Sequence, residues 1–269
     1  MAATIALVTD VHFGPPARFD GKLRKLSHDA PRLLSEVIDR LRAELRPDAL
    51  VNLGDDLEDE ARDVDLARYL ECQAILRRAG CPVLNVVGNH DSVHLGVADL
   101  NRAWGRVGNL YYSQDLLGFH LVVLQTTETK DVDVRIDAPQ LEWLERDLAE
   151  TRLPTVVLMH HPASEQDLHD SRWFSRAPHL ALVRERGALR SVLEASGKVR
   201  LVFNGHVHRN HVDVVRGITY VTLQSLVENL DDDAPGRPAA AFAIARLTEE
   251  RAIVRVHGAD PAAYQIELG

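Results

Sequence analysis

The sequence predicts an α/β protein whose strands run mostly parallel, and two observations carry this prediction. Short apolar runs rich in β-branched residues alternate with amphipathic helical segments along most of the chain. This is the pattern of right-handed strand–helix–strand crossovers. Several of the apolar runs also end in Gly, Asp, Asn or His. Because ligands of parallel sheets bind beyond the carboxyl ends of the strands, these polar ends indicate a functional site there.

The first half of the chain supplies three expected strands and two expected helices. Apolar runs at 4–9, 48–53 and 82–87 predict strands, and the helical spacing of leucines predicts helices at 30–46 and 63–79. The first helix is expected to stop before Pro47 and the second at Gly80. The segment 13–28 is rich in Gly and Pro and is expected to be a loop. Its basic residues either attract an anion or simply face solvent.

The second half continues the pattern and then changes character. Helices are expected at 97–105, 138–150 and 185–196, a strand pair at 110–113 and 119–126, and further strands at 155–159 and 199–203. Four β-prone runs joined by short turns follow, at 212–215, 218–223, 240–245 and 253–256. They predict an antiparallel layer. Because no stretch reads as a linker, we interpret residues 1–269 as a single domain.

Composition excludes several classes of protein. The chain has 269 residues, 45% of them hydrophobic, and a net charge of -9, so specific nucleic acid binding is not expected. Two cysteines, Cys72 and Cys81, are expected to be free thiols. No run approaches the roughly 18 apolar residues of a membrane span, and the N-terminus does not read as a signal peptide. We therefore expect a cytoplasmic protein without membrane contact.

Eight polar residues that follow apolar strands form the main functional signal. Taken alone, residues 88–92 also fit an ordinary turn, and a lone histidine is usually structural. Five of the thirteen histidines, however, lie at strand ends together with two aspartates and an asparagine. Mixed imidazole and carboxylate ligands favour Zn, Mn or Fe, and eight candidates exceed one tetrahedral site, which indicates two metal ions. The candidates are Asp10, His12, Asp55, Asn89, His90, His160, His206 and His208.

In order along the chain, these motifs resemble those of the calcineurin-like metallophosphoesterases. The resemblance spans residues 4–208 and implies a four-layer α-β-β-α sandwich, with two mixed β-sheets flanked by helices and two metal ions at the strand ends. The metals it implies are Mn and/or Fe, with Zn as an alternative. The motifs are Asp10-x-His12, Gly54-Asp55, Gly88-Asn89-His90-Asp91, His160-His161 and Gly205-His206-x-His208.

The resemblance also implies a role for each site residue. A hydroxide bridging the two metals would attack phosphorus, and His90 would protonate the leaving oxygen. Asp91 would orient and charge-stabilise the imidazole of His90. His161 would either bind metal or support a ligand. The implied ligands are Asp10, His12, Asp55 and His208 for the first metal, and the bridging Asp55 with Asn89, His160 and His206 for the second.

Departures from the family's motifs narrow the choice of branch. Protein phosphatases of this superfamily carry Asp-Arg-Gly beginning three residues after the bridging aspartate, and purple acid phosphatases carry a tyrosine there, whereas this chain has Glu58. The chain length and the Gly-Asn-His-Asp motif resemble class III cyclic-nucleotide phosphodiesterases. The tail at 217–228 is similar to manganese-dependent ADP-ribose/CDP-alcohol diphosphatases.

Candidates for substrate contact lie in and near the polar segment 163–180. Trp173 and Phe174 offer an aromatic face for a base and Arg176 a cation for phosphate, although this stretch also fits a lid that packs on the core. His94 lies close to a metal motif and is a further candidate. We expect hydrolysis of phosphodiester or pyrophosphate bonds in small nucleotide-like molecules. The alternatives are a phosphomonoesterase and a catalytically silent scaffold.

Overall fold

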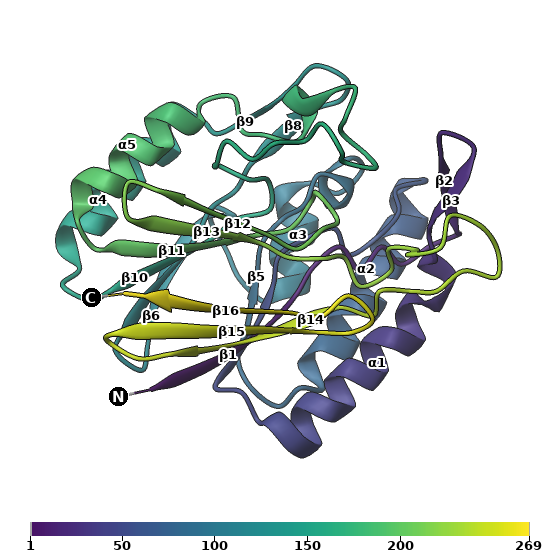
Figure 1. Cartoon of the computed structure of the whole chain (residues 1–269), viewed down its shortest axis with the longest axis horizontal. Coiled ribbons are helices and arrows are strands. Elements are labelled where there is room, and N and C mark those ends of the chain that lie inside the picture. Colours follow the sequence, from purple (N-terminus) through teal and green to yellow (C-terminus); the bar gives the residue numbers. More distant parts are fainter. Residues whose placement is uncertain (1, 269) are drawn as a thin grey trace.

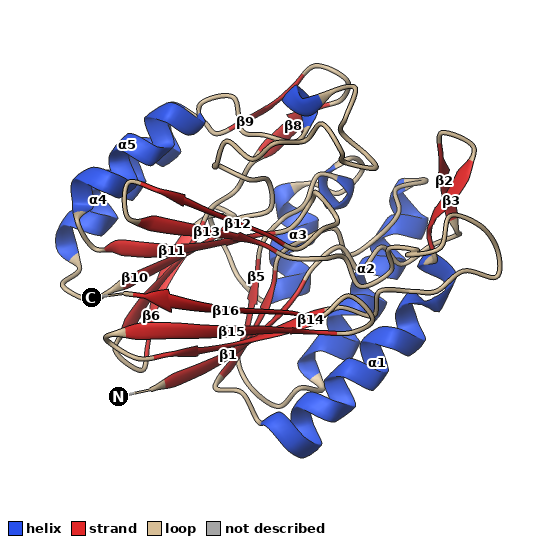
Figure 2. Cartoon of the chain, in the orientation of Figure 1, coloured by secondary structure: helices blue, strands red, loops and turns tan. Residues whose placement is uncertain are grey.

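Two mixed β-sheets of six strands each lie face to face between two layers of helices (Figure 1, Figure 2). The computed structural model describes residues 2–268. Alternate residues of the first strand serve different layers: Ile5 and Leu7 join Leu121 in the core between the sheets, whereas Ala6 and Val8 pack with the outer helices. The expected α/β four-layer sandwich is therefore confirmed.

The first half of the chain builds one half of the first sheet, in which β1, β4 and the edge strand β5 are parallel. The helices α1 and α2 cover its outer face (Figure 1). The expected strands and helices are present, with ends that shift by a few residues. The elements are β1 (Ala3–Val8), η1 (Ser27–Asp29), α1 (Ala30–Arg40), η2 (Leu41–Leu45), β4 (Ala49–Asn52), α2 (Arg62–Arg77), β5 (Val83–Asn85), η3 (His90–Ser92) and α3 (Val97–Trp104).

The second sheet has the strand order β12-β13-β11-β10-β7-β6, and α4 and α5 pack on its outer face. Strands β7, β10, β11 and β13 are parallel, and β6 and β12 run antiparallel to their neighbours. The elements are β6 (Tyr112–Leu116), β7 (Phe119–Val123), α4 (Ala138–Glu150), β10 (Thr155–Leu158), η4 (Pro178–Leu180), α5 (Arg186–Ser196), β11 (Val199–Asn204), β12 (His211–Val215) and β13 (Ile218–Thr222).

The expected antiparallel pairing of the tail strands is confirmed, but the strands do not form one layer, because they are divided between both sheets. Strands β12 and β13 complete the second sheet, whereas β14 (Phe242–Leu247), β15 (Arg251–His257) and β16 (Ala262–Glu267) extend the first, with β14 antiparallel to β1. Local β-propensity identified most of these strands. The sheet that each strand joins depends on partners far away in sequence, which a local pattern does not contain.

Two short β-ribbons project beside the strand ends (Figure 2). The first, β2 (Ala17–Phe19) and β3 (Lys22–Lys25), replaces the loop expected at 13–28. Its turn residues Asp20 and Gly21 have φ values of 53° and 77°, and an Asp-Gly turn with two positive φ values is a strong hairpin signal that was overlooked. The second ribbon, β8 (Thr127–Thr129) and β9 (Asp133–Arg135), was not expected.

Two smaller expectations concern thiols and membranes. Cys72, buried in α2, and the partly buried Cys81 are free cysteines, as expected. Among the described helices, none combines the length and the apolar character that a bilayer crossing requires.

Candidate metal centre

The carboxyl ends of five strands bring the predicted metal ligands to one place. The loops after β1 and β4 carry three of them, the loop after β5 carries one, and those after β10 and β11 carry three. Six of the seven side chains are at most 8% exposed, so this is a charged cluster inside the protein. The six are Asp10, His12, Asp55, His160, His206 and His208, and the seventh, Asn89, is partly buried.

The first group joins the loops after β1 and β11. The Nε2 atom of His208 lies 3.2 Å from Asp10 Oδ1 and 3.2 Å from His12 Nε2. The Nε2 atom of His12 also lies 3.7 Å from Asp55 Oδ2. These donor atoms surround one point, as ligands of a shared cation would.

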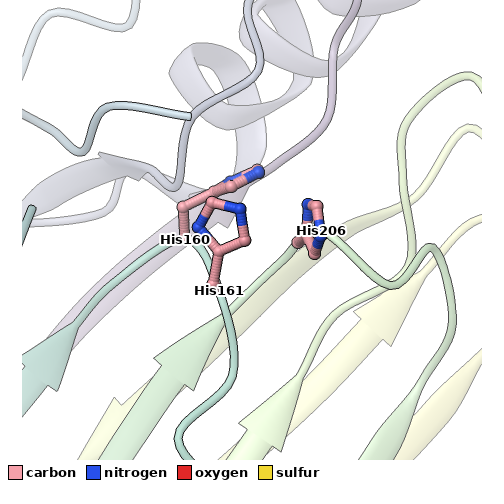
Figure 3. A group of neighbouring side chains, drawn as sticks. All are labelled: His160, His161 and His206. Carbon is pink, nitrogen blue, oxygen red and sulfur yellow. The ribbon is translucent and has the colours of Figure 1, made fainter. Parts of the chain in front are cut away.

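The second group lies on the other side of Asp55. The Nε2 atom of His160 is 3.3 Å from Asp55 Oδ2 and 3.1 Å from Asn89 Oδ1. The ring of His206 lies 5.0 Å from that of His160 (Figure 3). The Nε2 atom of His206 donates to the carbonyl oxygen of Leu180 at 3.1 Å, which leaves its Nδ1 atom for the cluster. Asp55 stands between the two groups, where a bridging carboxylate would be.

The backbone at this cluster is strained. L-residues with side chains rarely adopt positive φ, at a cost of about 1–2 kcal/mol each. Five of the predicted ligands do so, and such strain gathers at functional sites because the surrounding structure must maintain it. The residues and their φ values are Asp10 (51°), His12 (50°), Asp55 (58°), His206 (69°) and His208 (55°).

Glycines allow neighbouring strand ends to approach closely at this point. A Cβ atom on Gly88 would collide with the backbone nitrogen and the carboxylate of Asp55, and one on Gly205 would collide with Thr9 Oγ1 and the carboxylate of Asp10. These glycines are therefore needed for space. They hold the loops on which Asp55 and Asp10 sit within contact of their neighbours.

The carboxylates of the cluster favour positive charge on two of its histidines. Burial acts to lower the pKa of His208, but Asp10 and Glu228 outweigh it and raise the pKa to about 9. Burial likewise opposes protonation of His160, yet Asp55 and Asp10 raise its pKa to about 10. Burial lowers the pKa of His206 to about 3. Carboxylates that stabilise positive charge beside imidazoles form a donor set that suits transition-metal ions.

The outer nitrogens of the histidines are fixed by groups that sequence analysis did not assign to the site. Glu228 Oε2 accepts from His208 Nδ1 at 2.9 Å, and Glu58 Oε1 lies 3.2 Å from His12 Nδ1. The carbonyl oxygen of Leu53 accepts from His160 Nδ1 at 2.8 Å. Such contacts set the tautomer and orientation of a metal-binding imidazole. The sequence distinguishes Glu58 only as a departure from the family's motifs. Its partner His12 is 46 residues away, so no local pattern predicts their contact.

The expected contact between Asp91 and His90 was wrong. His90 Nδ1 lies 2.5 Å from Asp59 Oδ1, whereas the Asp91 carboxylate accepts backbone N–H bonds from Asp55, Asp56 and Gly88 at 2.7–2.9 Å. Residues 90–92 form a 3₁₀ turn, so adjacent side chains point in different directions. The His90 side chain therefore faces the cleft, whereas the Asp91 carboxylate binds the backbone of the loops that follow β4 and β5.

His161 is also buried at the cluster. Its Nδ1 atom lies 2.7 Å from Thr126 Oγ1, and its ring is 4.1 Å from that of His206 (Figure 3). Its Nε2 atom is buried without a hydrogen-bond partner among the described residues. One nitrogen each of His160, His161 and His206 falls within a single 4.8 Å group. Both roles considered for His161, metal ligand and support for a ligand, therefore fit its position.

A cleft of about 590 Å³ opens above the cluster, with His12, Asp55, His90, His206 and His208 in its lining. Two of the expected substrate contacts, Trp173 and Phe174, line the same cleft.

The other two expected substrate contacts are placed elsewhere. Arg176 has a side chain that is 84% exposed and lies 3.5 Å from Asp20 in the turn of the first ribbon. His94 Nδ1 lies 2.7 Å from Asp65 Oδ2. Both residues fall outside the described lining of the cleft, and their contact with substrate stays a prediction.

The two-sheet sandwich, with buried aspartates and histidines at its strand ends, defines a metal-dependent phosphoesterase. The family profile described as "Calcineurin-like phosphoesterase" matches residues 3–210, and the chain belongs to this family. The chain is accordingly a hydrolase of phosphoric esters, and the family implies two metal ions. The resemblance seen in the sequence is thereby confirmed.

Relatives and a solved structure agree with this assignment. A protein of Synechococcus sp. named "Probable cyclic nucleotide phosphodiesterase" is 28% identical over 81% of this chain and 78% of its own length. The "cAMP/cGMP dual specificity phosphodiesterase" of Mycobacterium tuberculosis is 31% identical over 67% of this chain and 55% of its own. The crystal structure of a dimetal phosphatase from Danio rerio matches with a TM-score of 0.78 at 18% identity, over 99% of both chains. It shares the fold.

Proposed function

We propose that this protein hydrolyses phosphodiester or pyrophosphate bonds of small nucleotide-like molecules. One observation carries the proposal: seven predicted ligands converge on a buried point beneath a cleft, and His90 stands in the lining of that cleft with Asp59 behind it. The names of the relatives support a diester substrate. The free cysteines agree with a cytoplasmic location.

The donor set fits two metal ions held on either side of Asp55. Asp10, His12 and His208 supply the donors on one side, and bound ions would supply an activated water and the positive charge that neutralises phosphate. The mixture of imidazole, carboxylate and amide suits Mn and/or Fe, with Zn as the alternative. The donors on the other side are Asn89, His160 and His206.

His90 is the residue placed to give a proton to the leaving oxygen. Its Nδ1 atom is taken by Asp59 at 2.5 Å, so its Nε2 atom is the one free to serve the cleft. The Asp59 carboxylate fixes the tautomer of the ring. Burial opposes protonation of His90, but Asp55, Asp59 and Glu58 outweigh it and raise the pKa of the ring, as a general acid requires. Asp59 thus takes over the role that the sequence analysis gave to Asp91.

Hydrolysis of two model compounds tests the proposal. Protein loaded in turn with Mn, Fe, Co and Zn is assayed on bis(p-nitrophenyl) phosphate and on p-nitrophenyl phosphate, beside Asp55→Ala and His90→Ala variants. We expect faster hydrolysis of the diester, its loss in Asp55→Ala and only a small reduction in His90→Ala, because nitrophenolate leaves without a proton donor. Faster hydrolysis of the monoester would establish the phosphomonoesterase alternative, which the same ligand set can serve. Inactivity with every metal on both compounds would contradict both enzymatic functions and favour a catalytically silent scaffold.

A further inference from the structure

Three aromatic side chains form one wall of the cleft, and we call Phe19, Trp173 and Phe174 the aromatic wall. Phe19 comes from β2 in the first ribbon, and the other two come from the segment between β10 and α5. The Phe19 and Trp173 rings lie 5.1 Å apart at 30°. All three line the cleft that contains the metal-centre histidines.

The aromatic wall is fixed relative to the predicted metal ligands. The Phe174 ring lies 4.7 Å from the ring of His206, and the Trp173 ring lies 5.3 Å from that of His208. Trp173 Nε1 donates to Glu228 Oε2 at 3.0 Å, and the same oxygen accepts from His208 Nδ1. A group stacked on this wall would therefore stand at a set distance from a phosphate bound at the centre.

The ribbon that carries Phe19 is held by contacts to Asp232, in the segment between β13 and β14. The carboxylate of Asp232 pairs with Lys22 and Arg24, and its carbonyl oxygen accepts from Leu23 N at 2.9 Å. The Lys25 ammonium lies 5.3 Å from the centre of the Trp173 ring. A rigidly held ribbon loses little conformational entropy when a ligand binds to it.

Phe19 is nevertheless 43% exposed, although it has a partner ring beside it and a cleft in front of it. A phenyl ring that served only to pack would gain from burial, about 25 cal/mol for each square ångström removed from water. A flat apolar face held open in a cleft is suited to stacking with another ring. This distinguishes Phe19 from the exposed Val93, which also lines the cleft but offers no ring.

We propose that the aromatic wall receives a planar heteroaromatic ring of the nucleobase class, and that Phe19 is the residue that selects for it. The inference rests on the proposed phosphoesterase function, since the ring must be joined to the phosphate held at the metal centre. Stacking is tolerant of the identity of the base, so the wall selects for nucleosides as a class.

Two diesters with the same leaving group test the role of Phe19. Thymidine 5′-(p-nitrophenyl) phosphate carries a base, whereas methyl p-nitrophenyl phosphate does not. In Phe19→Leu, which keeps an apolar side chain but removes the ring, we expect KM for the thymidine ester to rise roughly tenfold. For the methyl ester, KM and kcat should change less than twofold. Phe19→Tyr, which keeps the ring, should retain the values of the unmodified protein.

The outcomes separate this inference from the function on which it rests. Equal changes for both esters, or no change for either, would contradict the stacking role of Phe19. Calorimetry measures the affinities for thymidine 5′-monophosphate and for deoxyribose 5-phosphate. Their difference reports the contribution of the aromatic wall to binding and does not depend on hydrolysis. We expect tighter binding of the nucleotide, by roughly tenfold, and loss of that preference in Phe19→Leu but not in Phe19→Tyr. Absence of the preference in the unmodified protein would overturn the inference, whereas failed hydrolysis alone would overturn only the proposed function.

Discussion

At the scale of single residues, two nearby carboxylates have separate tasks. Asp59 lies against His90 at the edge of the cleft, and Asp91 accepts three backbone N–H bonds inside the loops. The sequence identified His90 and the importance of residues 88–92. It did not show the direction of each side chain, because a one-residue step around a 3₁₀ turn decides it. Nothing in the sequence distinguishes Asp59 from the neighbouring acidic residues, so its contact with His90 was not predicted.

Replacement of Asp59 should affect the chemical step. Asp59→Asn removes the hydrogen-bonded charge that, beside Asp55 and Glu58, raises the pKa of His90, so kcat should fall roughly tenfold to a hundredfold on a diester with an alkoxide leaving group. The fall should be much smaller on bis(p-nitrophenyl) phosphate, because nitrophenolate departs without a proton donor. Steady-state kinetics on both esters measure the difference. A loss of the same size on both would show that Asp59 does not act through proton transfer.

Replacement of Asp91 should affect stability. Asp91→Ala leaves the buried N–H groups of Asp55, Asp56 and Gly88 without their acceptor, at a cost of roughly 3 kcal/mol or more. We expect a lower melting temperature, measured by calorimetry, and a loss of activity that is similar for all leaving groups. Unchanged stability with selective loss on poor leaving groups would return Asp91 to the role first expected for it.

At the scale of elements, local patterns predicted the strands and helices well but not every connection between them. Each of the helices α1 to α5 was expected close to its observed range, because the apolar spacing that predicts a helix lies within the element itself. The first ribbon was not predicted, although its Asp20-Gly21 turn is a hairpin signal. That ribbon supplies Phe19 and Lys25 to the cleft.

His120 ties three elements together and should make stability depend on pH. It sits on β7 and faces Asp147 on α4 at 2.9 Å and Asp115 on β6 at 2.7 Å, and these contacts raise the pKa of His120. The stabilisation is present below about pH 6.5, where unfolded histidine is charged, and is lost as pH rises through the higher pKa of the folded protein.

The variant His120→Gln tests this pH dependence, because it removes the titrating imidazole. Its melting temperature should fall below that of the unmodified protein by about 2–4 °C near pH 6, and the gap should narrow by pH 9. His169→Gln changes an exposed histidine and serves as the control. A gap that stays constant with pH would show that His120 contributes by packing alone.

At the scale of the whole molecule, the two sheets bring together predicted metal ligands that are almost 200 residues apart in sequence. The order of the motifs and their place after strands allowed the set to be predicted, because parallel strands present their carboxyl ends at one edge. The supporting contacts could not be predicted. Glu228 reaches His208 because the chain after β13 returns to the metal centre, which no local pattern indicates. Because β14 to β16 complete the sheet begun by β1, we infer that the chain folds as one domain.

Metal binding should stabilise the whole molecule. Removal of metal leaves Asp10 and Asp55 buried beside each other without a bound cation, and a ligand that binds only the folded state raises its stability by mass action. We expect Mn²⁺ to raise the melting temperature of chelator-treated protein by several degrees. Asp55→Ala, which removes the proposed bridge, should show a clearly smaller rise. An equal rise in that variant would exclude Asp55 as a ligand.

The central claim is that two metal ions held by these side chains are needed for phosphodiester hydrolysis. Titration of chelator-treated protein with Mn²⁺, with bound metal and hydrolysis of bis(p-nitrophenyl) phosphate measured in the same samples, tests it most directly. We expect activity to reach its full value when two ions are bound per chain. Full activity with one ion, or activity that persists without metal, would contradict it.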